Sequence, residues 1–171
     1  MFFARKWYVL ILFFSLAACG SNLSPSGEDK SKPGGQTAPD FSVSDIDNNT
    51  VTLASALSGK KGIVLYFTMW CPVCDAHMNH MLDNTIPQFP DIGFYAVDYV
   101  SSSVSGARNS AAASGFVGTP FTILADLGHQ MLNGYDATMG TTVVIDSGGI
   151  IRMNEDYKDG SGLKEVLSGL Q

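Results

Sequence analysis

The stretch GIVLYFTMWCPVC, residues 62–74, decides the fold of this chain. Its first six residues after Gly62 are apolar, aromatic or β-branched, which is typical of a strand buried on both faces of a sheet. The strand runs into a Cys-x-x-Cys motif, and helical spacing follows from Asp75 to Phe89. Cys71 is therefore expected at a helix N-terminus. There, unpaired N–H groups and the helix dipole stabilise a thiolate and lower its pKa from about 8.5.

The motif predicts a redox-active pair of thiols. Cys74 lies one helical turn after Cys71, close enough to attack a mixed disulfide on Cys71 and release the substrate. Pro72 suits the first helical turn, because the N–H group that it lacks would have no partner there. Two cysteines cannot make a four-cysteine zinc site, so the sequence assigns no metal to the pair.

The first 18 residues are typical of a signal peptide. Arg5 and Lys6 give it a charged start, and the apolar run from Trp7 to Leu16 is too short to span a bilayer. Residues 16–19 read LAAC, which resembles a bacterial lipobox. That resemblance implies cleavage before Cys19, a diacylglycerol on its sulfur and a protein anchored to a membrane. An uncleaved anchor helix and a free Cys19 are alternatives, and each reading places the domain outside the cytoplasm.

Residues 19–36 are expected to form a lipidated N-terminus and a flexible tether. They are rich in Ser, Gly, Pro and charge, and have too few apolar residues to pack. Residues 37–171 have the length of one domain. Without Arg5 and Lys6, about 8 basic residues face 16 acidic ones. The resulting net charge, about −8, argues against nucleic acid or an anionic lipid surface as a partner.

The domain alternates strand-like and helix-like segments. Strands are predicted at residues 41–43, 51–53, 62–68, 92–98 and 121–124, with a final hairpin of 141–146 and 150–153. Helices are predicted at residues 54–57, 71–86, 103–114, 127–133 and 162–170. This order predicts an α/β fold, with a mixed central sheet and helices on both of its faces.

Four stretches carry a resemblance to a known family. They read APDF at 38–41, VTL at 51–53, WCPVC at 70–74 and TVVID at 142–146. Through them the domain resembles the thioredoxin-fold redoxins, specifically the membrane-tethered TlpA/ResA-like thiol-disulfide oxidoreductases, which are related to AhpC/TSA proteins. The resemblance implies a thioredoxin-like fold and a monomeric enzyme without a cofactor. It also implies a disulfide-containing client protein and a membrane protein as electron donor.

The chain departs from this family in the loop that faces the cysteines. The family normally has a cis-proline there, just before the first strand of the final hairpin. Counting back from Asp146 puts Gly140 at that position, within a substrate loop of Met139, Gly140 and Thr141; Pro120 is the alternative. Glycine lacks the ring that shields the dithiol and fixes the backbone. We therefore expect weaker client docking, easier access for soft metals, and higher activity in Gly140→Pro.

A second departure lies on the helix that follows the motif. Relatives usually have a glutamate three residues after the second cysteine, which accepts the proton of the buried thiol. This chain has His77 there, and a histidine that titrates near pH 6.5 can take that proton. A half-exposed surface histidine is the alternative. His80 is expected to project further from the buried face and to have no role.

The leading interpretation is an extracytoplasmic thiol-disulfide oxidoreductase. Cys71 is the nucleophile, Cys74 resolves the mixed disulfide and His77 assists. Thr68, Trp70 and Pro72 are expected to support the motif from around it. A reductase of protein disulfides, rather than an oxidase, is favoured by the family resemblance.

Two other functions remain open. Thr68 and Cys71 fit the Thr-x-x-Cys pattern of a peroxiredoxin-like thiol peroxidase, although Val64 replaces the upstream proline of that motif. A copper-binding redoxin or metallochaperone would instead use the two cysteines with His77 or Met139, because soft sulfur ligands suit Cu(I). His129 is the candidate histidine outside the active-site helix.

Overall fold

The computed structural model describes residues 35–170, so the predicted signal peptide, Cys19 and most of the predicted tether lie outside the described residues. Within residues 35–170, no helix has the length and apolar character to cross a membrane. Gly35 and Gln36, which composition assigns to the tether, already belong to the folded part. The Gly35 N–H donates to the Ile151 carbonyl (2.7 Å), and the Ile151 N–H donates to the Gln36 carbonyl (2.8 Å).

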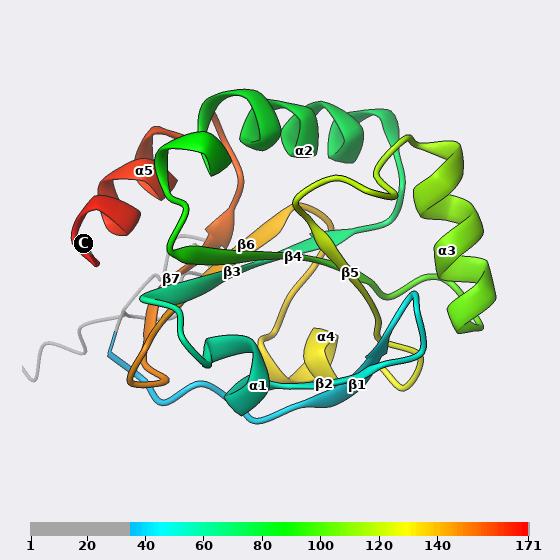
Figure 1. Ribbon diagram of the computed structural model, residues 1–171, viewed down its shortest axis with the longest axis horizontal. Helices are drawn as coiled ribbons and strands as arrows, with labels where there is room; N and C mark the ends of the chain where they lie inside the picture. The colour runs from blue at the N-terminus through cyan, green and yellow to red at the C-terminus, as the bar shows by residue number, and fades with distance from the viewer. Residues whose placement is uncertain (1–34, 171) are drawn as a thin grey trace, which may run out of the picture.

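The described residues form one seven-stranded sheet with five α-helices and a short 3₁₀ helix (Figure 1). The strands are β1 (Ser42–Asp45), β2 (Thr50–Thr52), β3 (Gly62–Thr68), β4 (Ile92–Asp98), β5 (Thr122–Ala125), β6 (Thr141–Asp146) and β7 (Ile151–Asp156). The helices are α1 (Leu53–Leu57), α2 (Pro72–Asn84), α3 (Val104–Ala113), α4 (Gln130–Gly134), α5 (Ser161–Ser168) and the 3₁₀ helix η1 (Ile86–Gln88).

The sheet is mixed, as predicted, and its strand order is β2-β1-β5-β4-β3-β6-β7. The strand β3 pairs parallel to β4 and antiparallel to β6. All seven of its residues are buried, because helices cover the sheet on both sides. Helices α2, α3 and α5 lie on one face, and α1 and α4 on the other (Figure 1).

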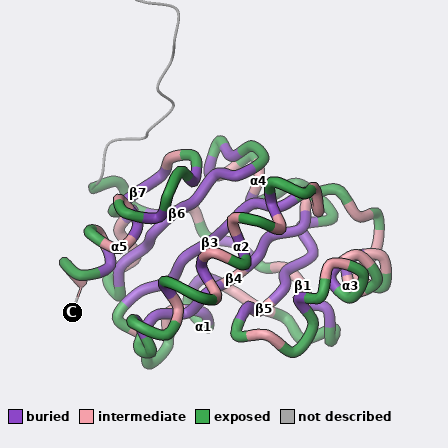
Figure 2. The backbone as a smooth tube through the Cα atoms, turned by 90° about the horizontal axis from the view of Figure 1, so that it is seen from above, coloured by how far each residue is buried: buried purple, intermediate pink, exposed green. Residues whose placement is uncertain are grey.

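Each face of the sheet has its own apolar core. The core under α2 includes Tyr66, Met78 and Met81, and the opposite core includes Phe67 and Tyr135; all five side chains have no exposed surface. Figure 2 shows the buried backbone concentrated in the central strands. Burying a large apolar side chain contributes about 1.5–3 kcal/mol, so these two layers hold β3 and the start of α2 in place.

The bounds predicted from the sequence are accurate for strands that combine a buried apolar run with turn residues at its ends. The strands at 62–68, 92–98 and 141–146 have the predicted bounds. The fourth helix is shorter than predicted and begins at Gln130, because His129 has a left-handed backbone (φ 54°) that a helix cannot include.

Strand pairing decides which loop lies beside the cysteine motif. The Gly140 N–H donates to the Phe67 carbonyl near the end of β3 (2.9 Å). Pro120 is exposed and lies two residues before Thr122, which pairs with Tyr95 in the middle of β4. Since β3, β4 and β5 are parallel, Pro120 lies toward the opposite end of the strands. Gly140, rather than Pro120, is therefore next to the motif.

Candidate active site

The two cysteines form a close pair at the start of α2. Cys71 is the N-cap of the helix, Pro72 is its first residue, and the Cys71 Sγ accepts a hydrogen bond from the Cys74 N–H (3.3 Å). Both thiols are free, and their Sγ atoms are 2.9 Å apart. Cys74 is fully buried whereas Cys71 is partly exposed. A disulfide that approaches from solution therefore reaches Cys71 before Cys74.

The surroundings of Cys74 favour its thiolate form. Burial opposes the ionisation of Cys74. The hydrogen bonds that it receives from the Cys71 side chain, the backbone of Met69 and Cys71, and the Thr68 hydroxyl outweigh this effect and lower its pKa. The hydrogen bond from the Cys71 side chain is the largest of these stabilising contacts, and the two Sγ atoms are 2.9 Å apart.

Trp70 is held in a constrained conformation just before the cysteines. Its backbone is left-handed (φ 58°), which costs about 1–2 kcal/mol for a residue with a Cβ. The Trp70 N–H donates to the Thr68 hydroxyl (3.1 Å), and its indole Nε1–H donates to the Asp98 carboxylate (2.8 Å). These bonds fix the turn that brings Cys71 to the start of α2.

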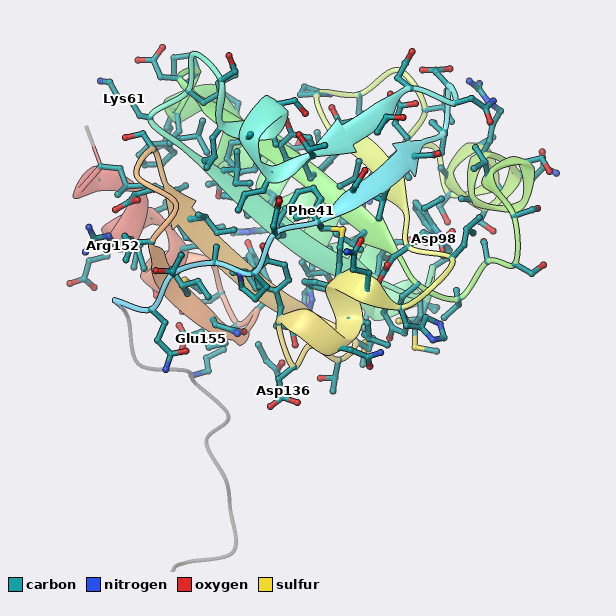
Figure 3. The ribbon with its side chains drawn as sticks, turned by 90° about the horizontal axis from the view of Figure 1, so that it is seen from below. Phe41, Lys61, Asp98, Asp136, Arg152 and Glu155 are labelled. Carbon is teal, nitrogen blue, oxygen red and sulfur yellow. The ribbon has the colours of Figure 1, made fainter. Side chains whose placement is uncertain are left out.

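Asp98 is a supporting residue that the sequence analysis missed. Its buried carboxylate, at the carboxyl end of β4 (Figure 3), accepts from Trp70, from the Val100 and Ser101 N–H groups (both 2.9 Å) and from the Ser101 hydroxyl (2.7 Å). A carboxylate that ends an otherwise apolar strand was the signal in the sequence. Buried carboxylates require such partners.

Tyr66 connects the buried thiol to the histidine. Its side chain has no exposed surface, and its hydroxyl lies 2.9 Å from His77 Nδ1. Burial raises the pKa of Tyr66, and the charge and hydrogen bond of Cys74 raise it further, so the phenol stays protonated. The sequence placed His77 directly on the flank of Cys74. In the structure, His77 instead contacts the Tyr66 hydroxyl, which in turn hydrogen-bonds Cys74.

A second tyrosine–histidine pair extends this cluster. The Tyr157 ring lies 4.8 Å from the His77 ring, and its hydroxyl lies 2.6 Å from His80 Nδ1. His80 thus contacts a buried tyrosine of this cluster, whereas the expectation that it has no functional role stays a prediction. Burial lowers the pKa of His77, and the charge of His80 lowers it further. His77 is consequently neutral and able to accept a proton at neutral pH.

The loop before β6 brings a third sulfur to the pair. Met139 Sδ is 3.7 Å from Cys71 Sγ. Gly140 has a left-handed backbone (φ 88°), and a Cβ added there would meet no atom within 4 Å. The Thr141 side chain is buried, accepts from the Thr138 N–H (2.9 Å) and donates to Asp156 (3.2 Å), which fixes the loop.

This geometry overturns the expectation for Gly140→Pro. Proline fixes φ near −65° and has no N–H. Gly140 has φ 88° and uses its N–H to bond the Phe67 carbonyl. Proline at this position would break the loop instead of making it rigid.

His129, the candidate copper ligand outside α2, is hydrogen-bonded to the backbone of another loop. His129 Nε2 lies 2.9 Å from the Tyr99 carbonyl, and a carbonyl can only accept, so this nitrogen carries the proton. Within residues 35–170, no three His, Cys, Asp or Glu side chains gather where they could bind one metal ion.

A Cys-x-x-Cys pair at the start of a helix, on a mixed sheet of this order, defines a redoxin, an oxidoreductase that works through thiols. The thioredoxin-like architecture agrees with this class. The chain belongs to the AhpC/TSA family, whose sequence pattern matches residues 34–154.

Solved structures with different activities share this fold. A protein assigned as the thiol:disulfide interchange protein DsbE from Chlorobium tepidum is 22% identical, with 80% of this chain and 96% of that chain covered and a TM-score of 0.65. The exposed lipoprotein thioredoxin Etrx1 from Streptococcus pneumoniae is 20% identical (77% and 99% covered, TM-score 0.60). Peroxidoxin BcpB from Mycobacterium tuberculosis is 19% identical (81% and 96% covered, TM-score 0.62).

At these identities the likeness shows the fold alone. No curated protein matches this chain by sequence. The choice among the activities of a redoxin therefore depends on the site itself.

Proposed function

We propose that this protein is an extracytoplasmic thiol-disulfide oxidoreductase that reduces disulfides of client proteins. The observation that carries the proposal is the partly exposed Cys71 Sγ, 2.9 Å from the buried Cys74 Sγ at the start of a helix. This arrangement supplies an accessible cysteine that can attack a client disulfide and an internal cysteine that can resolve the mixed disulfide.

The reaction proceeds in two exchanges. The Cys71 thiolate attacks one client sulfur, forms a mixed disulfide and expels the other client sulfur as a thiolate. Cys74 then attacks Cys71 Sγ and expels the second client sulfur. Two electrons have passed to the client, and the Cys71–Cys74 disulfide remains. A membrane protein with a dithiol returns two electrons and restores the pair.

Cys74 needs a proton acceptor for the second exchange. The Tyr66 hydroxyl can accept the Cys74 proton while it donates its own to His77 Nδ1, which lies 2.9 Å away. The lowered pKa of His77 keeps the ring neutral before the transfer. The relay thus lets a buried thiol ionise without placing a charged base beside it.

The surroundings of Cys71 support docking of a polypeptide. Val73, two residues after Cys71, is 52% exposed, and Met139, which contacts Cys71, is 39% exposed. Exposed apolar side chains favour contact with an apolar segment of a client. The substrate loop of Met139, Gly140 and Thr141 would receive that segment beside the sulfur.

The proposed direction of electron flow, toward the client, is supported by the neutral character of the groups that hydrogen-bond the sulfurs. These hydrogen bonds come from the Cys74 N–H and from the Thr68 and Tyr66 hydroxyls. Neutral donors stabilise a thiolate less than a nearby cation does. Strong oxidants depend on a highly stabilised reduced form, so this pair is expected to be reducing.

The reduction potential tests this proposal. Equilibration of the Cys71–Cys74 pair with glutathione or dithiothreitol is expected to give a potential near or below about −250 mV. A value near −120 mV would show an oxidant and refute the reductase. Failure of the reduced protein to reduce the disulfides of insulin would refute disulfide exchange itself.

The geometry favours exchange over the peroxidase alternative. The Thr68 hydroxyl accepts from the Trp70 N–H and hydrogen-bonds Cys74. In a Thr-x-x-Cys peroxidase site, this hydroxyl orients a peroxide at the first cysteine. Hydrogen peroxide turnover faster than disulfide reduction would reverse this preference.

We also propose that the domain is held on the extracytoplasmic side of a membrane by lipid on Cys19, and acts as a monomer. The LAAC sequence at residues 16–19 supports the anchor. Cys19→Ala is expected to move the protein from the membrane fraction to the soluble fraction. Retention in the membrane fraction would instead indicate an uncleaved leader.

A further inference from the structure

The partly exposed Cys71 contacts two other sulfur atoms. Its Sγ lies 2.9 Å from Cys74 Sγ and 3.7 Å from Met139 Sδ. Met139 lies 68 residues from Cys71 in the chain and is 39% exposed. Disulfide exchange requires the two thiols and leaves the thioether without a chemical role.

We propose that Cys71, Cys74 and Met139 bind one Cu(I) ion in the reduced protein. Thiolate and thioether sulfurs are soft ligands that select this ion. If metal–sulfur bonds are about 2.3 Å long, as in zinc–thiolate sites, a planar three-coordinate site places its sulfurs about 4 Å apart. The 3.7 Å between Cys71 and Met139 already fits this spacing.

The distance between the two cysteine sulfurs needs a local adjustment. The Cys71–Cys74 separation of 2.9 Å must widen by about 1 Å to reach the same spacing. Rotation of the partly exposed Cys71 side chain can supply it, while Cys74 stays buried. Gly140 leaves this side open, because a Cβ there would touch no atom within 4 Å.

The donor set also discriminates among metals. Zinc sites normally take four ligands from Cys, His and carboxylates. The described residues bring no three such side chains together, and His77 Nδ1 is already paired with the Tyr66 hydroxyl. Two thiolates and one thioether are enough for Cu(I), whereas a harder ion would lack donors.

Binding exchanges protons for metal and leaves the copper oxidation state unchanged. The two thiols lose their remaining protons, and the resulting thiolates and one Cu(I) give the site a net charge of −1. Formation of the Cys71–Cys74 disulfide removes both thiolates and so releases the ion. Copper binding and disulfide exchange therefore compete for the same sulfurs, but the copper site does not rest on the proposed reductase activity.

The test is an anaerobic titration of the reduced full-length chain with Cu(I), in competition with a coloured Cu(I) chelator. The wild type is expected to bind one ion per chain. Met139→Leu should bind at least about tenfold more weakly, since even the loss of an outer-shell partner costs 10–100-fold in metal affinity. Met69→Leu is the matched control, because Met69 is similarly exposed (44%) next to the motif. It should bind as tightly as the wild type.

X-ray absorption of the loaded protein supplies the second measurement. Three sulfur neighbours around copper are expected in the wild type and in Met69→Leu, and two in Met139→Leu. Wild-type affinity and three sulfurs in Met139→Leu would overturn the proposal, as would a reduced wild type that binds no Cu(I). Disulfide reduction by the same proteins without copper is measured separately, so failure of the reductase is distinguished from failure of the metal site.

Discussion

Removal of the Tyr66 hydroxyl tests the proposed proton relay from Cys74 through Tyr66 to His77. Tyr66→Phe keeps the buried ring, but removes the group that lies 2.9 Å from His77 Nδ1 and hydrogen-bonds Cys74. A hydrogen bond to a charged group contributes about 1.5–3 kcal/mol. Its loss should therefore raise the pKa of Cys74, and about 1.36 kcal/mol corresponds to a tenfold change in the ionisation equilibrium.

A higher pKa of Cys74 slows the second exchange, in which Cys74 resolves the mixed disulfide. Below its pKa, Cys74 would have about 10–100-fold less thiolate, partly offset by the greater nucleophilicity of a more basic thiol. With a Brønsted coefficient of about 0.4–0.5, the net loss is about 3–15-fold. The loss of proton transfer to His77 can only add to it. The first exchange, which uses Cys71, should change much less.

The assay uses an aromatic disulfide that releases a coloured thiolate at each exchange. Rapid mixing with reduced protein gives a first phase from attack by Cys71 and a second from resolution by Cys74. Both rates are recorded against pH. Tyr135→Phe is the matched control, because it removes a buried hydroxyl, bonded to the Pro39 carbonyl at 2.7 Å, from the opposite core. Each variant should lose about 1 kcal/mol of stability.

Only Tyr66→Phe should slow the second phase and move its pH dependence upward. If its second phase has the wild-type rate and pH profile, the relay does not exist and His77 is a structural residue. If Tyr135→Phe slows the second phase equally, loss of stability rather than loss of the hydroxyl explains the effect.

Three further predictions follow from the same contacts. Cys71→Ser should abolish disulfide reduction, whereas Cys74→Ser should accumulate a mixed disulfide with its client, visible on a non-reducing gel; faster alkylation of Cys74 than of Cys71 would reverse these roles. The pKa of His77 is held below its ordinary 6.5, so the folded state should lose stability as pH falls below about 6.5; urea unfolding of His77→Gln should show a weaker loss over that range. Gly140→Pro should cost about 3 kcal/mol or more, because it loses the bond to Phe67 and cannot adopt φ 88°. Gly140→Ala should cost about 1–2 kcal/mol, and equal thermal melting of the two variants would contradict the loop geometry.

Features that depend on neighbours in the chain could be predicted from the sequence of this protein. A continuous apolar run predicted the buried strand Gly62–Thr68, and the motif after it predicted Cys71 at a helix N-terminus. Turn residues and alternating apolar stretches predicted the mixed sheet. Each of these features follows from local periodicity, capping and burial, which a single segment carries within a few residues.

Only the tertiary structure decided what surrounds the two sulfurs. Met139 contacts Cys71 across 68 residues, and Trp70 bonds Asp98 across 28. These contacts depend on β6 lying antiparallel beside β3, and β4 parallel on its other side. A burial pattern says that Tyr66 faces a core, but it does not say which histidine reaches its hydroxyl. Strand order and register set these distances, because they bring the ends of separate strands to one edge of the sheet.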